Sequence, residues 1–333
     1  MKRVELAETA NIDTLQIVER DTPRPGPGEI LMRVRASSLN FHDYLVVMGI
    51  LKAAAGRVPL SDGAGEVVEV GAGVSGLKAG DRVMGTFFAS WFDGPPTPEK
   101  VALMRGDQVD GYAAEYVTVD ARTVTRVPAG LSDVEAATLP CAGLTAWRAL
   151  FVEADVKPGD VVLVEGTGGV SIFGLQFARM AGATVIGLSS TPEKLERLKA
   201  LGAAHVVNYR EEPKWGSVVR DLTGGRGVDI ALEVVGGDLT QTMTAQRLGG
   251  RTILIGALSR QPISYASMHA ITGNRSVSGI TVGSRAHQED MVRAIEQNGL
   301  KPVIDRTFGL DEIKDSLRYM ETKAYFGKVA LAW

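Results

Sequence analysis

A glycine-rich run at 166–171, Gly-Thr-Gly-Gly-Val-Ser, is the part of the sequence whose spacing could most directly do chemistry. Phosphate oxygens need backbone N–H donors at close range, and glycines leave that approach open because they carry no side chain. The run follows the apolar segment 160–165 and precedes a helix predicted over 170–181, whose positive N-terminal end favours a pyrophosphate. This context favours a dinucleotide-binding loop over an ordinary turn between a strand and a helix. The predicted contacts are Gly166, Gly168, Gly169 and Val170.

Two neighbouring features refine this prediction. Ser171 stands where the usual spacing has a third glycine, and its small side chain is expected to be tolerated in helix–strand packing. The second predicted strand, 183–188, leads into Ser-Ser-Thr and not into an acid that would bind a ribose 2′-hydroxyl. Hydroxyl donors and a nearby lysine suit the 2′-phosphate of NADPH, although a polar helix cap with a solvated lysine explains the same residues. The predicted cofactor is therefore NADPH, with contacts from Ser189, Ser190 and Lys194.

The elements that must position this loop divide the chain into two predicted domains. Residues 1–126 contain short apolar runs separated by Gly and Pro turns, which are typical of β-strands, and an irregular Pro-rich lobe at 90–108. After residue 127 strands alternate with helices, which predicts a parallel sheet with right-handed crossovers. The chain then returns as a helix over 310–321 and a strand over 327–332. Its 333 residues exceed what one hydrophobic core usually covers, which also favours two domains.

The composition excludes several classes of function. Net charge is −3, so the chain has no basic surplus with which to bind nucleic acid or an anionic membrane. No stretch reaches the roughly 18 apolar residues of a membrane helix, and the N-terminus has no apolar core of signal-peptide length. Cys141 is the only cysteine, so an intrachain disulfide and a multi-cysteine zinc site are excluded. We therefore expect a cytoplasmic protein with no nucleic-acid or membrane partner.

Four segments of the chain resemble the medium-chain dehydrogenase/reductase superfamily: Gly-Glu-Val-Val-Glu-Val-Gly-Ala-Gly-Val at 65–74, Lys-Ala-Gly-Asp-Arg-Val at 78–83, Leu-Thr-Ala-Trp at 144–147 and Phe-Gly-Lys-Val at 326–329. The resemblance covers nearly the whole chain in the family's order. It implies an α/β fold in which a Rossmann parallel-sheet domain, 127–284, is inserted into a GroES-like β-rich catalytic domain, 1–126, completed by 285–333. It also implies that substrate and nicotinamide meet between the domains, and that the protein forms a homodimer through an edge strand at 276–282.

The zinc-binding branch of this superfamily carries a Cys where this chain has Asn40 and a His where it has Ser61. Neither residue is a credible zinc ligand, and the four-cysteine structural lobe is replaced by the Pro-rich lobe. The sequence is therefore similar to the zinc-independent, quinone-oxidoreductase-like branch, and no metal-binding residue is predicted. Without a metal to polarise an oxygen, hydride transfer suits acceptors that are already electrophilic, such as quinones and α,β-unsaturated carbonyls.

The catalytic candidates lie within the segment 40–44. Asn40 could donate its amide to a carbonyl oxygen, or it could hold a backbone turn. His42 stands where the zinc-binding branch has a proton-relaying hydroxyl, and its ordinary pKa suits a proton donor near neutral pH, although a structural histidine explains it equally. Tyr44 is either a donor or a packed aromatic, and Asp43 is expected to be structural. Residues that could line an apolar pocket, or simply pack the lobe, are Trp91, Phe92 and Tyr112.

The resemblance also implies cofactor contacts outside the glycine-rich loop. Each could be structural by itself, but one bound dinucleotide explains them together. They are Thr145 near the nicotinamide, Tyr209 near the adenosine phosphate, Val235, Gly256 and Ala257 at later strand ends, and Gly283, Ser284 and Lys328 facing the cleft.

The predicted function is an NADPH-dependent reductase of a small electrophilic molecule, a quinone or an activated enone. Hydride passes from the nicotinamide, while Asn40 and either His42 or Tyr44 serve the oxygen. One alternative is a metal-free alcohol or ketone dehydrogenase that uses His42 as its acid and base. A second alternative, from a different class, is a dinucleotide-binding sensor or structural protein that has lost turnover.

Overall fold

A computed structural model describes every residue, Met1 to Trp333, and the chain forms two compact units. Unit 1 comprises 1–144 and 282–333, and unit 2 comprises 145–281. The first border lies downstream of the predicted one at 126/127, because the helical segment that follows residue 132 groups with unit 1. The β-rich unit is thus built from both ends of the chain, and the other unit is a single insert.

A mostly antiparallel sheet of seven strands forms the framework of unit 1. Its strands are β3 (Glu29–Ser38), β4 (Ala64–Val70), β5 (Arg82–Gly85), β6 (Tyr116–Asp120), β7 (Val124–Arg126), β14 (Ile304–Phe308) and β15 (Lys328–Ala332). The order is β14-β15-β3-β4-β5-β7, with β6 paired to β3. The alternation predicted for Ile30, Met32 and Val34 is confirmed, since all three are at most 1% exposed and share one core cluster. This sheet brings the C-terminal strand directly beside β3.

Short helices and a two-stranded ribbon complete unit 1. They are β1 (Lys2–Glu5), β2 (Gln16–Glu19), α1 (Phe41–Val47), α2 (Asp133–Ala136), α9 (Arg285–Asn298), α10 (Ile313–Glu321), the 3₁₀ turns η1 (Ala121–Thr123) and η4 (Leu310–Glu312), and the π-helical η2 (Leu139–Gly143). The helix predicted over 310–321 is therefore a 3₁₀ turn that continues into α10. The lobe at 90–108 contains no helix or strand, only isolated bridges, which confirms its predicted irregularity.

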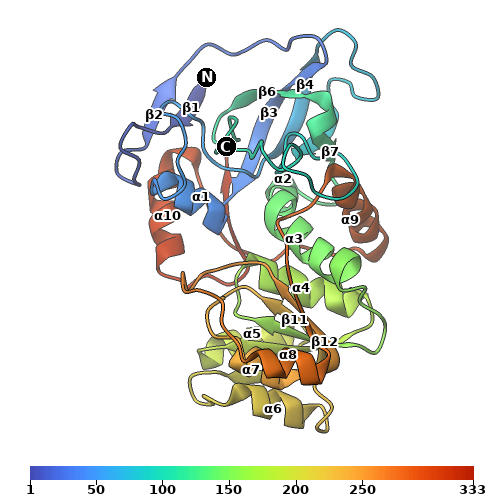
Figure 1. Ribbon diagram of the computed structural model, residues 1–333. Helices are drawn as coiled ribbons and strands as arrows, with labels where there is room; N and C mark the ends of the chain where they lie inside the picture. The colour runs from blue at the N-terminus through green and yellow to red at the C-terminus, as the bar shows by residue number, and fades with distance from the viewer. The chain divides into compact units, whose positions relative to one another are not determined.

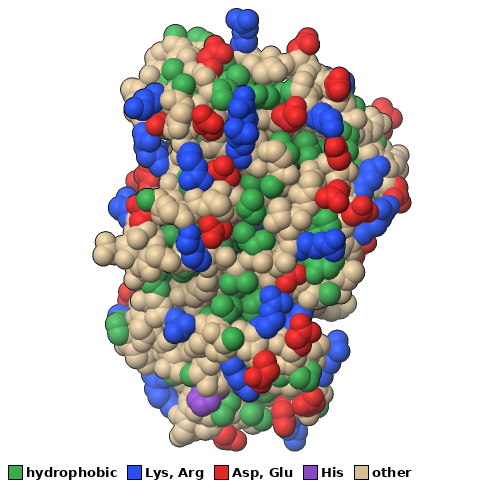
Figure 2. All heavy atoms as spheres, turned by 180° about the vertical axis from the view of Figure 1, so that it is seen from behind, with side chains coloured by type: hydrophobic (Ala, Val, Ile, Leu, Met, Phe, Trp, Pro, Cys, Tyr) green, Lys and Arg blue, Asp and Glu red, His purple; other side chains and the backbone are tan.

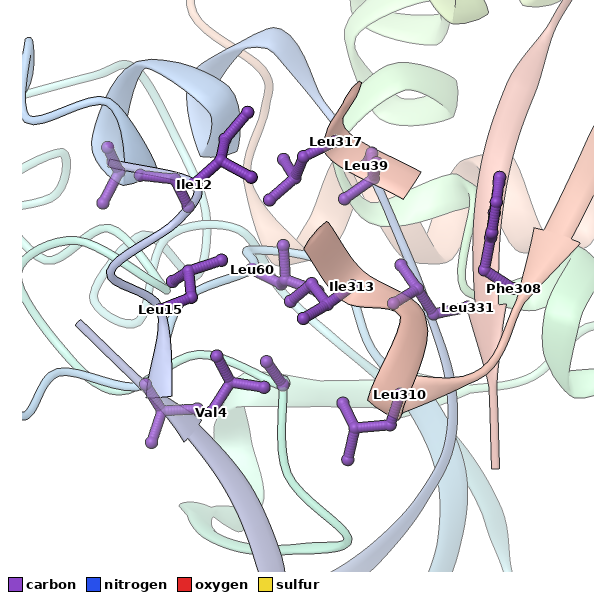
Figure 3. Close-up of a cluster of buried hydrophobic side chains, with 14 of the residues drawn as sticks. Val4, Ile12, Leu15, Leu39, Leu60, Phe308, Leu310, Ile313, Leu317 and Leu331 are labelled. Atoms are coloured by element: carbon purple, nitrogen blue, oxygen red, sulfur yellow. The ribbon is translucent and has the colours of Figure 1, made fainter. Parts of the chain in front are cut away.

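One hydrophobic core of unit 1 joins the two ends of the chain. Val4 and Leu15, from the N-terminal segment, belong to the same cluster as Ile313 and Leu317 of α10 and Leu331 of β15. Figure 3 shows these side chains converging on one interior, and none is more than 4% exposed. Burying one such side chain contributes about 1.5–3 kcal/mol, so the C-terminal return stabilises the unit in which the chain begins.

A parallel sheet of six strands organises unit 2, as the alternation of strands and helices predicts. Its strands are β8 (Val161–Glu165), β9 (Thr184–Ser189), β10 (His205–Asn208), β11 (Val228–Glu233), β12 (Gln246–Leu254) and β13 (Ser276–Gly279). The order is β10-β9-β8-β11-β12-β13, and all neighbours are parallel. The chain winds outward from β8 in both directions, so β8 and β11 meet at the point where the strand order reverses. Open parallel sheets bind ligands at the carboxyl ends of the strands at this point.

Helices flank the sheet of unit 2 (Figure 1). They are α3 (Leu144–Trp147), the π-helical η3 (Arg148–Glu153), α4 (Gly169–Met180), α5 (Pro192–Ala200), α6 (Trp215–Leu222), α7 (Thr240–Ala245) and α8 (Ser267–Gly273). Thr191 caps α5 by accepting the backbone N–H of Lys194, as the sequence predicts.

Close approach of α4 to the sheet depends on Gly174. A Cβ atom there would lie 2.5 Å from Leu232 Cδ1 of β11. Ser171, which replaces the third glycine of the loop, is 2% exposed, and its hydroxyl donates to the Glu165 carbonyl oxygen at 2.6 Å. The serine is therefore tolerated as predicted, but the tight helix–strand contact belongs to Gly174.

Charged side chains of both signs are interspersed over the face shown in Figure 2. A nucleic-acid backbone favours a stripe of positive charge, and this face carries none. No helix in the protein is both long enough and apolar enough to cross a membrane.

Candidate functional site

The start of α1 fixes the backbone around the first catalytic candidates. Asn40 is the N-cap residue, and its backbone N–H donates to Asp43 Oδ2 at 2.8 Å. Asp43 Oδ1 accepts the backbone N–H of Ser61 at 2.8 Å, which ties the loop before β4 to the helix. Asp43 is only 1% exposed. It has the structural role that the sequence predicts, and it brings Asn40 beside Ser61.

A buried polar cluster surrounds Asn40 and consists of Ser38, Asn40, Ser61, Asp62 and Lys328, none more than 7% exposed. The ammonium of Lys328 donates to Asn40 Oδ1 at 2.6 Å and to the Leu39 carbonyl oxygen at 2.7 Å, and it lies 3.5 Å from Asp62 Oδ2. Asp62 Oδ2 also accepts from the Ser38 hydroxyl at 2.6 Å. Strand pairing builds this cluster, because β15 and β4 both pair with β3.

Lys328 fixes the orientation of the Asn40 amide. An ammonium can only donate, so the amide atom that faces it is the oxygen. The Asn40 nitrogen therefore faces Asp62 Oδ2 at 2.8 Å and Ser61 Oγ at 3.3 Å. The longer contact, with Ser61, is the one that a substrate oxygen could replace most easily.

Asp62 is the acid of this cluster, and the sequence analysis did not single it out. Its Oδ1 atom is buried and has no hydrogen-bond partner. Burial raises the pKa of Asp62, and the Lys328 ammonium offsets that effect only in part. Since a buried carboxylate needs a counter-charge, the cluster depends on the pairing of these two residues.

His42 lies between two buried carboxylates. Its Nδ1 is 3.7 Å from Asp43 Oδ1 and its Nε2 is 3.5 Å from Asp107 Oδ2. Burial lowers the pKa of His42, but the two carboxylates outweigh it, so the pKa is raised above its usual 6.5. The histidine ring also packs edge-on against Phe87. The two carboxylates therefore favour the protonated form of His42.

The aromatic candidates are engaged in packing. The Tyr44 hydroxyl donates to Glu321 Oε1 at 2.8 Å, so the structure pairs Tyr44 with the end of α10 and not with the Asn40 cluster. Trp91 is 1% exposed and Tyr112 is fully buried. A Cβ atom at Gly63 would lie 2.3 Å from the Tyr112 ring, which shows how tightly that ring is enclosed. Packing therefore explains both residues, Trp91 in the lobe and Tyr112 in the core of the unit 1 sheet.

The donor set around Asn40 does not suit zinc. An amide and a hydroxyl occupy the positions of the family's Cys and His ligands, and the Lys328 ammonium already donates to the amide oxygen. No group of three or more His, Cys, Asp or Glu side chains is arranged to hold a metal ion. Burial raises the pKa of the Cys141 thiol well above its usual range.

The glycine-rich loop of unit 2 forms an open cradle. Gly166 has φ +77°, which favours glycine, and a Cβ atom on Gly166 or Gly168 would meet no other atom within 4 Å. Gly168 is the N-cap of α4 and supplies no side-chain cap, so the first N–H groups of Gly169 and Val170 are available to an external acceptor. An open cradle at the start of a twelve-residue helix fits the predicted pyrophosphate.

The end of β9 carries the residues predicted to select NADPH. Ser189 is only 3% exposed, and its carbonyl accepts the N–H of Tyr209 at 3.2 Å. Ser190 and Lys194 are half-buried. Burial within the sheet separates Ser189 from the other two, so an incoming 2′-phosphate would meet Ser190 and Lys194.

Two further loops follow β11 and β12. Val235 is 42% exposed, and Gly236 has φ +73°. A Cβ atom on Gly236 would lie 3.3 Å from the Ala257 Cα atom, and one on Gly256 would lie 2.6 Å from the Val234 carbonyl oxygen. The structure therefore places the loop that carries Val235 beside the loop that carries Gly256 and Ala257, and their contact with a cofactor stays a prediction.

The remaining predicted cofactor contacts are divided between the two units. Thr145, which is 4% exposed, and Tyr209, which is 40% exposed, belong to unit 2. Gly283 and Ser284 belong to unit 1, where the Ser284 hydroxyl caps α9 by accepting the N–H of His287 at 3.2 Å. Ser284 is fully buried, and Lys328 directs its ammonium into the Asn40 cluster. The hydrogen bonds of Ser284 and Lys328 within unit 1 explain these two residues without a cofactor.

Sequence reasoning missed four buried polar residues: Asp62, Glu165, Glu233 and Thr242. A signal was present for the two glutamates, because Glu165 ends the apolar run 160–165 and Glu233 lies within the apolar run 228–235. A charged residue at the end of a buried strand needs a partner, and the sequence alone does not show which partner it has.

Comparisons with known proteins agree with this architecture. Residues 26–129 match the alcohol dehydrogenase GroES-like domain, and residues 169–297 match the zinc-binding dehydrogenase domain. A zinc-type alcohol dehydrogenase-like protein of Schizosaccharomyces pombe is 39% identical over 97% of this chain and 96% of its own length.

Two crystal structures share the fold over the whole chain. A candidate alcohol dehydrogenase of Sinorhizobium meliloti superposes with a TM-score of 0.94 at 40% identity, and 99% of it is covered. An NAD-dependent alcohol dehydrogenase superposes with a TM-score of 0.92 at 31% identity, and all of it is covered. Together with the open glycine-rich cradle, these likenesses support a nicotinamide cofactor. The chain belongs to the medium-chain dehydrogenase/reductase superfamily and is an oxidoreductase of the alcohol-dehydrogenase-like kind.

Proposed function

We propose that this protein is a zinc-independent, NADPH-dependent reductase of quinones or α,β-unsaturated carbonyls. The observation that carries the proposal is the bond between Lys328 Nζ and Asn40 Oδ1, at 2.6 Å, inside the buried polar cluster. A lysine ammonium donates to the side chain that stands in place of the first zinc ligand, so the cluster already holds its own cation. A divalent ion there would meet an ammonium and an amide in place of thiolate and imidazole.

The chain's residues have distinct roles in this proposal. Bound reduced nicotinamide would supply the hydride, and the polarised carbon of an electrophilic acceptor would take it. Asn40, oriented by Lys328, would donate its amide N–H to the oxygen on which negative charge develops. His42, which lies between Asp43 and Asp107, would supply the proton that completes the reduction.

NADPH is proposed over NADH because β9 leads directly into Ser190 and Thr191 and not into an acid. Ser190 can donate to a 2′-phosphate, and Lys194 can supply positive charge from the first turn of α5. One of the similar solved structures is an NAD-dependent alcohol dehydrogenase, so the preference for NADPH over NADH has to be measured.

The test begins with calorimetric titration of NADPH and NADH into metal-stripped protein whose metal content has been checked. We expect NADPH to bind at least about tenfold more tightly, which corresponds to about 1.4 kcal/mol. Turnover is then measured on a panel of quinones, enones and simple ketones, before and after addition of zinc. Faster reduction of the quinones and enones with no gain from zinc supports the proposal.

Other results of this test would overturn the proposal. Zinc-stimulated oxidation of simple alcohols would support the zinc-type activity named for the yeast relative. Turnover of simple ketones without metal would support a metal-free alcohol dehydrogenase. Tight NADPH binding with no turnover across the panel would support the non-catalytic sensor.

A further inference from the structure

Two buried glutamates face one another at the centre of the unit 2 sheet. Glu165 is the last residue of β8 and Glu233 is the last residue of β11, and these strands are hydrogen-bonded neighbours. The two residues are 6% and 2% exposed. The Thr242 hydroxyl of α7 lies 3.2 Å from Glu165 Oε1 and 3.0 Å from Glu233 Oε2. The mechanism proposed above does not use this group of residues.

The two contacts that Thr242 makes with Glu165 and Glu233 require one proton in addition to the hydrogen of the Thr242 hydroxyl. A hydroxyl has a single hydrogen, so Thr242 can donate to one carboxyl only, and the other carboxyl must itself be a donor. Glu233 Oε1 accepts the N–H groups of Val235 and Gly236 at 2.8 and 2.9 Å, so Glu233 is already engaged as an acceptor. The extra proton therefore belongs on Glu165. In agreement, burial and then the adjacent Glu233 raise the pKa of Glu165 well above its usual range.

No other charged group near the pair supplies a counter-ion. Helices α4 and α7 and strand β9 carry one ionisable side chain among them, Arg179, and it donates to the Leu201 carbonyl oxygen. On the neighbouring strand β12, Arg247 pairs with Asp229 of β11, which Arg226 also contacts, and Arg251 donates to the Ala154 carbonyl oxygen. Glu233 is thus the charge that acts on Glu165.

The pair connects two loops. Glu165 directly precedes Gly166, and its carbonyl oxygen accepts the hydroxyl of Ser171, so both its backbone and its side chain belong to the base of the glycine-rich cradle. Glu233 holds the turn at Val235 and Gly236 through two backbone N–H groups. A proton between the carboxyls therefore links the phosphate loop to the turn that follows β11.

We propose that Glu165 and Glu233 share one proton, and that this proton holds the two loops in the arrangement that binds the dinucleotide. The inference rests on the proposed function for the identity of the ligand. Glu165 and Glu233 are positioning residues, because they act through the loops and not on the substrate. Loss of the proton would leave two buried negative charges side by side, which would separate the strand ends and weaken binding.

The sign of the pH dependence follows from this arrangement. The folded protein keeps a proton that the unfolded chain loses above the usual pKa of a glutamate. Stability therefore falls as the pH rises from that value to the folded pKa of Glu165. Dinucleotide affinity falls above the folded pKa, by up to about tenfold per pH unit for one coupled proton.

The test compares the wild-type protein with Glu165→Gln, whose amide donates permanently, and with Glu196→Gln as an exposed control. NADPH dissociation constants and melting temperatures of the unliganded protein are measured from about pH 6 to about pH 9. We expect the stability of the wild type and of Glu196→Gln to fall as the pH rises to the folded pKa of Glu165, and their NADPH affinity to fall above that pKa. Glu165→Gln should have flatter profiles and bind more tightly than the wild type at the alkaline end. Parallel profiles for all three proteins would overturn the proposal.

Infrared spectroscopy of the wild-type protein keeps the proposal testable if Glu165→Gln does not fold. A neutral carboxylic acid has a C=O stretching band distinct from that of a carboxylate, and we expect this band at neutral pH and its loss on alkaline titration. Its absence at neutral pH would refute the shared proton while leaving NADPH binding intact. If the band is present and NADPH fails to bind at any pH, the proposed function fails and the proton stands without its role in binding.

Discussion

The pairing of Lys328 with Asp62 determines what the Asn40 cluster can do. An asparagine amide is a weak catalytic group unless its nitrogen is directed at the reacting oxygen. Lys328 directs it by donating to the oxygen end of the amide. Asp62 in turn accepts from both the Asn40 nitrogen and Ser38, so the orientation of Asn40 depends on the charge balance of its neighbours.

Replacing Lys328 with Met should destabilise the protein by about 3–5 kcal/mol, because it leaves the buried Asp62 without its cation. The raised pKa of Asp62 sets the sign of the pH dependence: its neutral form fits the fold, so the loss should grow as the pH rises and Asp62 must ionise. Chemical denaturation between acid and neutral pH measures this effect.

The double variant Lys328→Met with Asp62→Asn should recover most of the lost stability, because it removes the charge that Lys328 compensates. Lys2→Met serves as the control, since Lys2 pairs with Asp311 in an exposed salt bridge and little change is expected. If the two lysine variants lose equal stability, the buried pair does not have the importance we assign to it.

His42 offers a second measurement at the scale of single residues. We expect His42→Gln to lower kcat on the order of 100-fold while leaving NADPH affinity unchanged, because general acid catalysis typically contributes at least that much. The raised pKa of His42 also predicts that wild-type stability falls as the pH rises through it, and that His42→Gln loses this dependence. A normal kcat for the variant would leave His42 only its structural role.

At the scale of elements, two glycines of α4 and its N-cap have different roles, one in leaving the phosphate cradle open and one in close packing against the sheet. The sequence pattern does not distinguish these roles. Gly168 faces open space at the start of the helix, whereas Gly174 lies against Leu232 of β11. Spacing from the first strand identifies the loop, but the glycine that permits close packing is visible only when the opposite strand is placed.

The two glycines should therefore respond differently to substitution. Gly174→Val should destabilise unit 2 by about 1–3 kcal/mol through overpacking. Gly168→Ala should leave the melting temperature almost unchanged and weaken NADPH binding, because its new methyl group projects into the cradle. Calorimetry of unfolding and of binding on both variants gives the comparison, and equal loss of binding in both would show that the cradle is not where the phosphate lies.

Local pattern was enough to predict most elements of unit 2. The strand predicted over 183–188 and the helix predicted over 170–181 follow from local sequence pattern, and the structure has both, as β9 and α4. Pattern could not predict that Lys328 reaches Asn40. That contact depends on strand pairing between residues that are nearly three hundred positions apart in sequence.

At the scale of the whole molecule, we propose a homodimer through β13. This strand is an edge of the unit 2 sheet, with backbone groups that no strand covers on its outer side. Exposed apolar side chains lie on the neighbouring elements β12 and α8: Leu248 is 64% exposed, Met268 57% and Ile271 66%. An edge strand beside apolar surface suits pairing with a second copy of the chain.

Light scattering coupled to gel filtration tests the dimer directly. We expect the wild type to be dimeric and Ile271→Glu to dissociate, because a buried charge would be introduced into the interface. Ile50→Glu, at a comparably exposed position of unit 1, should remain dimeric. A monomeric wild-type protein, or dissociation of both variants, would contradict the proposed interface.

The placement of β15 has a consequence for biosynthesis. β15 lies between β14 and β3 in the sheet of unit 1. The first strands of this sheet are synthesised early, but the sheet cannot be completed until residues 328–332 have been made. Unit 2, a continuous insert, can complete its own sheet earlier, because domains tend to fold as they emerge. The nascent chain would then hold a finished dinucleotide cradle while the Asn40 cluster still lacks its lysine. A ribosome stalled shortly before Lys328 would therefore display a species that binds cofactor and cannot yet orient Asn40.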